Sequence, residues 1–144
     1  MVHIDSDVSI RHGSNEIENK DASGTVQGSP LWILRGEGAA VLLGAVLLYA
    51  SAGFGWWQFA ILFLVPDLSM LGYLSNKCDG AITYNLGHNY LLPAVLLLIG
   101  EVVSSEQMLA CSLIWIAHVG FDRMLGYGLK YQSAFKHTHL STSS

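Results

Sequence analysis

Four ionisable side chains stand out because each lies within a strongly apolar stretch of the sequence: Asp67, His88, His118 and Asp122. His118 and Asp122 are four residues apart, so a helix places them on one face. The carboxylate can then accept a hydrogen bond from the imidazole, orient the ring and raise its basicity. This pattern predicts general acid–base catalysis, with His118 as the base and His88 or Asn85 positioning the substrate. Asp67 would act as the acid or stabilise developing positive charge.

A second group of polar residues could bind or orient a substrate: Asn85, Asn89, Arg35, Glu37 and Arg123. A continuous helix would place both asparagines on one face together with His88, because the spacing is i, i+3 and i+4. For the asparagines, a purely structural role as hydrogen bonds between helices is an equal alternative. The three charged residues lie near the ends of apolar stretches, where ion pairs or side chains that reach back to water are the simpler interpretation.

Neither a metal nor an organic cofactor is expected from the motifs of the chain. The two cysteines have no CxxC spacing, and the sequence contains neither a GxGxxG motif nor a P-loop. A metal alternative stays open, since His88 and His118 with Asp67 or Asp122 would make a set of two histidines and one carboxylate.

The composition is that of a membrane protein. Of the 144 residues, 51% are hydrophobic and only 12% are charged, whereas soluble domains average about 25% charged residues. The mean hydropathy is +0.41. Seven Lys and Arg residues against eleven Asp and Glu residues also exclude a nucleic-acid-binding role. The expected partners are therefore the lipid bilayer and an apolar small molecule.

Apolar segments of about 20 residues, the length that crosses a bilayer as a helix, predict an all-α four-helix transmembrane bundle with spans at about 31–52, 56–73, 81–100 and 108–127. The polar N-terminal tail, 1–30, is expected to be disordered because it has no apolar periodicity. A polar C-terminal tail covers 128–144. Pro66 and Pro93 could kink the second and third spans, which a membrane protein tolerates where the helix lines a cavity.

Positive charge predicts the orientation of the bundle. All seven Lys and Arg residues lie in the tails, in the 75–80 loop or near the adjoining ends of the spans. The positive-inside rule therefore places both termini in the cytosol. On this topology the intramembrane polar residues fall in the cytosolic half of the bundle, while the outer half is almost entirely apolar. We expect one inward-facing polar pocket, because an unpaired charge in hydrocarbon costs about 2.5–3.5 kcal/mol.

Several motifs resemble a known family. They are PDLSMLGY at 66–73, Tyr84-Asn85 with His88 and Pro93, and HVGFDR at 118–123 followed by GYGLKY at 126–131. LRGEG at 34–38 and Phe135-Lys136 with Thr138-His139-Leu140 are similar to the two borders of the same family. Together, over about residues 31–140, they resemble the small membrane-protein family called domain of unknown function 4260. The resemblance implies a four-helix membrane domain and brings no established activity.

The favoured hypothesis is a small multi-pass membrane enzyme that uses acid–base chemistry on an apolar substrate, as an isomerase, cyclase or hydrolase does. A proton-linked transporter or relay is the first alternative, and it would require a homo-oligomer because four helices are few for a transporter. A structural or accessory membrane protein is the second alternative.

Overall fold

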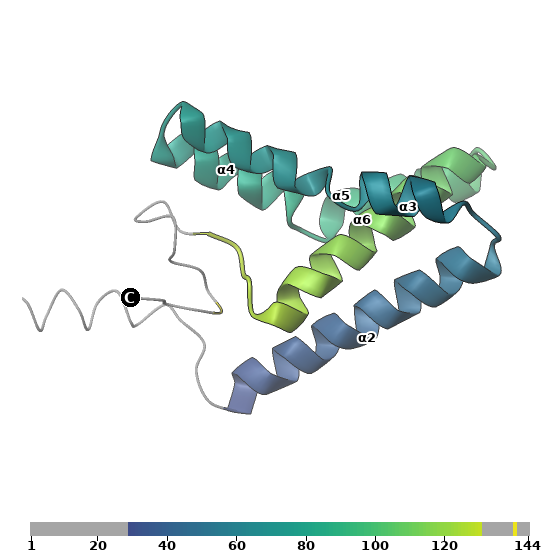
Figure 1. Ribbon diagram of the computed structural model, residues 1–144, viewed down its shortest axis with the longest axis horizontal. Coiled ribbons are helices and arrows are strands. Elements are labelled where there is room, and N and C mark those ends of the chain that lie inside the picture. Colours follow the sequence, from purple (N-terminus) through teal and green to yellow (C-terminus); the bar gives the residue numbers. More distant parts are fainter. Residues whose placement is uncertain (1–28, 131–139, 141–144) are drawn as a thin grey trace, which may run out of the picture.

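The computed structural model describes residues 29–130 and 140 (Figure 1). The predicted disordered tail lies outside the described residues, except for its last two positions. Most of the predicted C-terminal tail, including His137 and His139, also lies outside them. Within the described part, the elements follow in the order α2 (Ser29–Ser51), α3 (Trp56–Leu62), η1 (Pro66–Leu74), α4 (Lys77–Gly87), α5 (Leu91–Val102) and α6 (Glu106–Leu125).

These elements form the four spans that the sequence predicts. The helical stretches long and apolar enough to cross a membrane are Ser29–Ser51, Trp56–Leu74, Cys78–Val102 and Glu106–Leu125. In Figure 1 the α2–α3 and α5–α6 connections lie at the right, while the start of α2, the η1–α4 connection and the end of α6 lie toward the left. The chain therefore runs up and down as four spans require, which confirms the predicted all-α fold. The cytosolic position of the termini stays a prediction.

The second span is not one regular helix. α3 ends at Leu62, and a 3₁₀ helix, η1, begins at Pro66. A proline has no backbone N–H and its ring crowds the preceding turn, so a regular α-helix is broken here. The predicted kink at Pro66 is therefore present, and it places Asp67 at the start of a new element.

The third span is also interrupted, between α4 and α5. The side chain of Asn89 caps both helix ends: its amide donates to the carbonyls of Asn85 (2.9 Å) and Leu86 (2.7 Å), and its oxygen accepts from the N–H groups of Leu91 (2.9 Å) and Leu92 (3.1 Å). The expectation that Asn85, His88 and Asn89 share one continuous helix face is therefore wrong, because α4 ends before His88.

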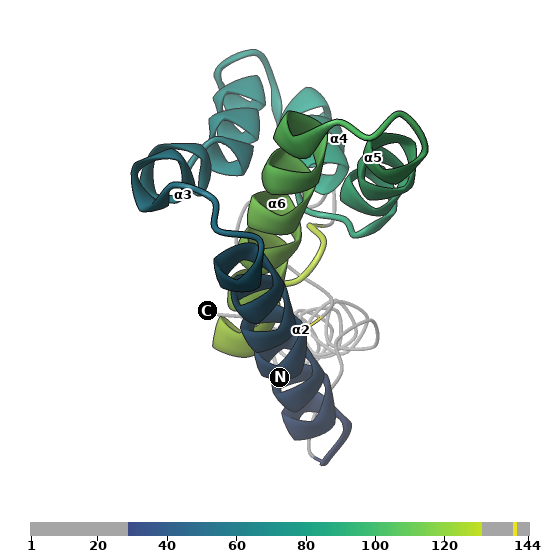
Figure 2. The same ribbon diagram turned by 90° about the vertical axis from the view of Figure 1, so that its right-hand side faces the viewer.

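α6 is the central helix of the bundle. Half of the residues in its most apolar stretch are buried, a far larger share than in any other span. α6 packs against α2, α3 and α5. Figure 2 shows α6 in the middle, with α3 and α5 on either side. α2 approaches α6 closely because glycines meet at the crossing: a Cβ on Gly120 would lie 2.8 Å from the backbone nitrogen of Leu42 and 3.0 Å from the carbonyl of Gly38.

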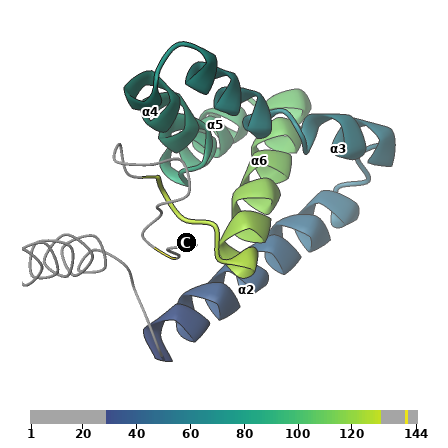
Figure 3. The ribbon, with the colours of Figure 1, turned by 60° about the vertical axis from the view of Figure 1, so that its left-hand side comes forward.

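η1 and α4 form a hairpin in which the two helices pack against each other. α4 is labelled in Figure 3. The hydroxyl of Thr83 on α4 donates to the carbonyl of Ser69 on η1 at 2.9 Å. At the turn, Asn76 caps α4 by accepting from the N–H of Asp79 at 2.8 Å. This hairpin brings the start of η1 beside the end of α4, and so brings Asp67 near His88.

Candidate functional site

Three side chains from distant parts of the chain meet at one point. The Nε2 atoms of His88 and His118 lie 3.3 Å apart. The Oδ1 atom of Asp67 lies 3.4 Å from Nε2 of His88 and 3.6 Å from Nε2 of His118. Asp67 comes from the start of η1, His88 from the interruption between α4 and α5, and His118 from α6. The structure thus brings together residues that are up to 51 positions apart in the sequence.

Asp122 is the fourth member of this group, which we call the His–Asp cluster (Asp67, His88, His118 and Asp122). Its Oδ2 atom lies 3.5 Å from Nε2 of His88 and 3.9 Å from Nε2 of His118. The second distance is too long for a hydrogen bond. The expected orientation of His118 by Asp122 is therefore not seen. Instead, the carboxylate of Asp122 accepts a hydrogen bond from the hydroxyl of Tyr84 at 3.4 Å.

The surroundings of His88 determine which of its ring nitrogens carries the proton. Nδ1 lies 3.0 Å from the carbonyl oxygen of Tyr84 and 3.4 Å from the hydroxyl of Ser69. A carbonyl oxygen can only accept, so Nδ1 is the donor in that contact. In the neutral imidazole, Nε2 then carries a lone pair that is directed into the cluster.

Tyr84 is a site residue that the sequence analysis treated only as part of a motif. Its ring stacks on the ring of His88, with centroids 3.9 Å apart and planes at 11°. The ammonium of Lys130 lies 4.1 Å from the centroid of the same ring. Burial lowers the pKa of Lys130, against the opposing attraction of Asp122 and Asp67. The i, i+4 spacing of Tyr84 and His88 was a signal that could have found the stacked pair.

The predicted orienting residues mainly hold the backbone in place. The amide of Asn85 donates to the carbonyl of Lys130 at 3.0 Å and accepts from its N–H at 2.7 Å. This pair fixes the segment after α6 across α4. Both polar atoms of the Asn85 amide are thus engaged with backbone, as are those of Asn89.

The charged members of the predicted orienting group behave in two ways. Arg123 donates to the carbonyls of His88 (2.9 Å) and Tyr127 (2.6 Å), so it ties α6 to the interruption that carries His88. Arg35 donates from Nε to the carbonyl of Met124 at 2.9 Å and so links the start of α2 to the end of α6. Glu37 is exposed and does not reach the cluster.

The cluster is buried except at one edge. His88 is fully buried, and His118 and Asp122 retain only 2% and 8% exposure. The side chain of Asp67 is 45% exposed. Asp67 is therefore the member of the cluster that a molecule arriving from outside would meet first.

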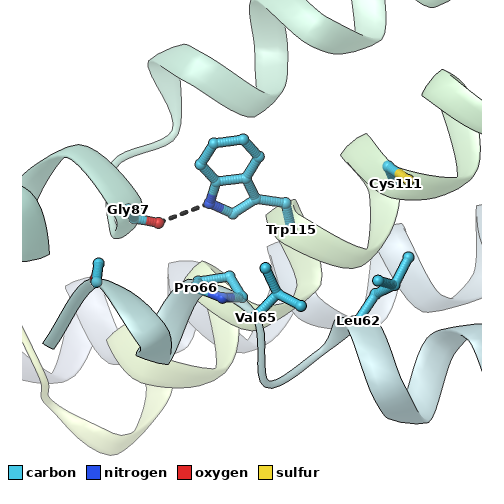
Figure 4. A pocket seen from close by; sticks show the side chains of 7 residues that line it. Leu62, Val65, Pro66, Gly87, Cys111 and Trp115 are labelled. Atoms are coloured by element: carbon cyan, nitrogen blue, oxygen red, sulfur yellow. Dashed lines mark hydrogen bonds between the residues drawn. The ribbon is translucent and has the colours of Figure 1, made fainter. Parts of the chain in front are cut away.

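An apolar pocket is lined in part by Pro66 and Gly87, the chain neighbours of Asp67 and His88 (Figure 4). It has a volume of about 270 Å³ and is lined by Leu62, Val65, Pro66, Ser69, Gly87, Cys111 and Trp115. The indole nitrogen of Trp115 donates to the carbonyl of Gly87 at 2.6 Å, which fixes the wall that α6 provides. Ser69 belongs both to the pocket lining and to the surroundings of His88. None of the four cluster residues lines this pocket, and its lining is mainly apolar, so it is not the polar pocket expected from the sequence. Its link to the cluster is the contact of Ser69 with Nδ1 of His88.

Three members of the cluster could also hold a metal ion. One ligand atom from each of Asp67, His88 and His118 lies within 4.8 Å of the other two. Two imidazole nitrogens and a carboxylate oxygen are donors that suit transition metals.

Comparison with known proteins identifies the family but no activity. The family model described as Domain of unknown function (DUF4260) matches residues 32–142. No curated protein and no solved structure matches the chain. The match covers the four spans except for the first three residues of α2, and it includes every member of the His–Asp cluster, so the chain belongs to the DUF4260 family.

Proposed function

We propose that this protein is an integral membrane enzyme that carries out acid–base chemistry on an apolar substrate. The observation that carries the proposal is the meeting of Asp67, His88 and His118 beside an apolar pocket. Buried ionisable groups in a membrane domain are costly, and their usual justification is function. Hydrolysis, isomerisation and cyclisation are the reaction types that such groups support without a nucleotide.

The position of each side chain suggests its role. Asp67 lies at the exposed edge of the cluster and is the group that would exchange a proton with the substrate. His88 presents a lone pair on Nε2 because its Nδ1 donates to the carbonyl of Tyr84. His118 lies within 3.6 Å of Asp67 and can accept or return the proton. The apolar part of the substrate would occupy the pocket next to Ser69.

The chain of aromatic rings beside His118 favours an enzyme over a proton relay. The ring of Phe63 contacts the imidazole of His118, with centroids 5.1 Å apart. Phe63 then stacks on Phe59, which contacts Tyr49 near the α2–α3 connection. A relay needs polar groups on both sides of the cluster, and this side is packed with aromatic rings.

A structural role is the second candidate, and particular contacts favour it for some of the polar residues. Backbone carbonyls accept the hydrogen bonds that the side chains of Asn85, Asn89 and Arg123 donate. The members of the His–Asp cluster, in contrast, mainly contact one another. Replacement of Asp67 separates the two candidates.

The experiment compares apolar metabolites and lipids in four strains. One lacks the gene, and the others are complemented with the wild type, with Asp67→Asn or with Asp79→Asn. Asp79 is the matched control because it is an exposed carboxylate in the first turn of α4. We expect the same compound to accumulate in the deletion and Asp67→Asn strains only. Full complementation by Asp67→Asn, at equal protein level, would contradict the proposal.

A further inference from the structure

We propose that Asp67, His88 and His118 form a binding site for one divalent transition metal, with zinc the ion that the geometry fits best. The ligand atoms are Oδ1 of Asp67 and Nε2 of both histidines. This inference uses the same side chains as the proposed function and rests on that function only for what the metal would do in catalysis. It departs from the expectation, drawn from motifs alone, that the chain uses no metal.

The distances between the three ligand atoms match a tetrahedral ion. Zinc binds histidine nitrogen and carboxylate oxygen at about 2.0–2.2 Å, so ligands at the corners of a tetrahedron lie about 3.3–3.6 Å apart. The observed separations are 3.3 Å between the two nitrogens, and 3.4 and 3.6 Å from these nitrogens to the carboxylate oxygen. Neighbouring ligands of an octahedral ion with bonds of about 2.1 Å would lie closer, at about 3.0 Å.

The protonation of His88 also favours a cation at this point. Because Nδ1 of His88 donates to the carbonyl of Tyr84, the neutral ring directs a lone pair from Nε2 toward Nε2 of His118. Metal ligation requires such a lone pair, and a hydrogen bond from the second nitrogen is the usual support for a ligating histidine. Asp67 and Asp122 would bring two carboxylates to the buried histidines, and a divalent ion would compensate their negative charge.

Asp122 is the carboxylate next to the two histidine ligands. Its Oδ2 atom is 3.5 Å and 3.9 Å from the two ligating nitrogens, and the hydroxyl of Tyr84 holds it there. Three protein ligands with one open position are typical of catalytic zinc, whose bound water has a pKa of about 7. With the metal bound, Asp67 and both histidines would be ligands, and the bound water rather than these side chains would supply the base of the proposed enzyme at neutral pH.

The test uses the full-length protein, purified in detergent without a polyhistidine tag. Metal content is measured by mass spectrometry, both as purified and after chelation followed by return of zinc. Cobalt is then added to the chelated protein, because its visible absorption intensifies when the ion is tetrahedral. We expect about one zinc per chain, an intense cobalt spectrum and a higher Tm with zinc than without it.

Variants locate the metal within the chain. His88→Gln and His118→Gln should lose at least nine tenths of the bound zinc. The matched control replaces the four remaining histidines, His3, His12, His137 and His139, and should keep the zinc. Less than a tenth of a zinc per wild-type chain after reconstitution would overturn the proposal. So would loss of the zinc from the control alone. If the two variants do not fold, the cobalt spectrum and the zinc-dependent Tm of the wild type show whether the proposed site binds a metal.

The outcome is independent of the proposed enzyme activity. If the chain binds no metal but Asp67→Asn still abolishes complementation, the protein is an acid–base enzyme that works without a metal. If the chain binds zinc but its Asp67→Asn variant complements fully, the metal site is structural and the proposed enzyme function is wrong.

Discussion

Tyr84 contacts the His–Asp cluster through three different groups. Its ring stacks on His88, its carbonyl accepts from Nδ1 of His88, and its hydroxyl donates to Asp122. The ring and the carbonyl together fix the plane and the tautomer of His88. Of these three groups of Tyr84, it is the hydroxyl that holds the carboxylate of Asp122 in place. A single residue therefore positions two members of the cluster, and its functions can be separated by substitution.

Replacing Tyr84 with phenylalanine should impair the site without unfolding the protein. The substitution keeps the stacked ring and the carbonyl but leaves Asp122 without its hydroxyl donor. Loss of a hydrogen bond in the surroundings of a metal site typically costs about 10–100-fold in affinity or activity. We expect a change of this size in zinc affinity, measured by competition with a coloured chelator, and a Tm close to that of the wild type.

Tyr127→Phe is the matched control for this experiment. Tyr127 is exposed, and only its backbone carbonyl takes part in a contact with Arg123, which the substitution retains. Equal zinc affinities for the two variants would show that the hydroxyl of Tyr84 does not support the site.

At the scale of elements, the two interrupted spans carry Asp67 and His88. Hydropathy and length predicted four spans correctly, because apolarity over about 20 residues depends little on local backbone detail. The interruption at Pro66 was visible in the sequence, since proline cannot continue a regular helix. In the third span Pro93 predicted a kink, but Pro93 lies within α5 and the interruption falls earlier, at His88. Its position depends on the way in which the side chain of Asn89 caps two helix ends at once. Such capping is a property of the folded backbone.

Asn89→Ala should loosen this interruption. The variant loses two hydrogen bonds to the end of α4 and two to the start of α5. A lost cap costs about 0.5–2 kcal/mol, so the Tm in detergent should fall by several degrees. Because His88 precedes Asn89 directly, zinc affinity should fall as well.

Asn76→Ala separates the effect on stability from the effect on the site. Asn76 also caps a helix, α4, but it lies at the exposed turn of the hairpin. This variant should lower the Tm and leave zinc affinity unchanged. If both variants affected zinc equally, the interruption would have no particular link to the site.

The described part of the molecule buries a few polar side chains in an otherwise apolar interior and exposes an apolar exterior. Large apolar side chains are exposed on every span, for example Leu47, Leu71, Leu98 and Leu125, as expected of surfaces that face lipid. The sequence predicted that Asp67, His88, His118 and Asp122 would face inward, because an isolated charge in hydrocarbon is expensive. It could not predict which atoms meet. The contact between the two Nε2 atoms depends on the hairpin and on the tilt of α6.

The orientation of this molecule in the membrane is the remaining prediction from charge. If the positive-inside rule holds, the η1–α4 turn with the exposed Cys78 faces the cytosol, and the α5–α6 connection faces the opposite side.

Two single-cysteine proteins, both with Cys111→Ser, test this. One keeps Cys78, and the other combines Cys78→Ser with Ser104→Cys at the exposed α5–α6 connection. In intact cells, a membrane-impermeant maleimide should label only the second protein, and permeabilisation should expose Cys78 in the first. The reverse pattern would place the arginine- and lysine-rich ends outside the cytosol. An enzyme with its half-exposed Asp67 on that side would draw its water and protons from there.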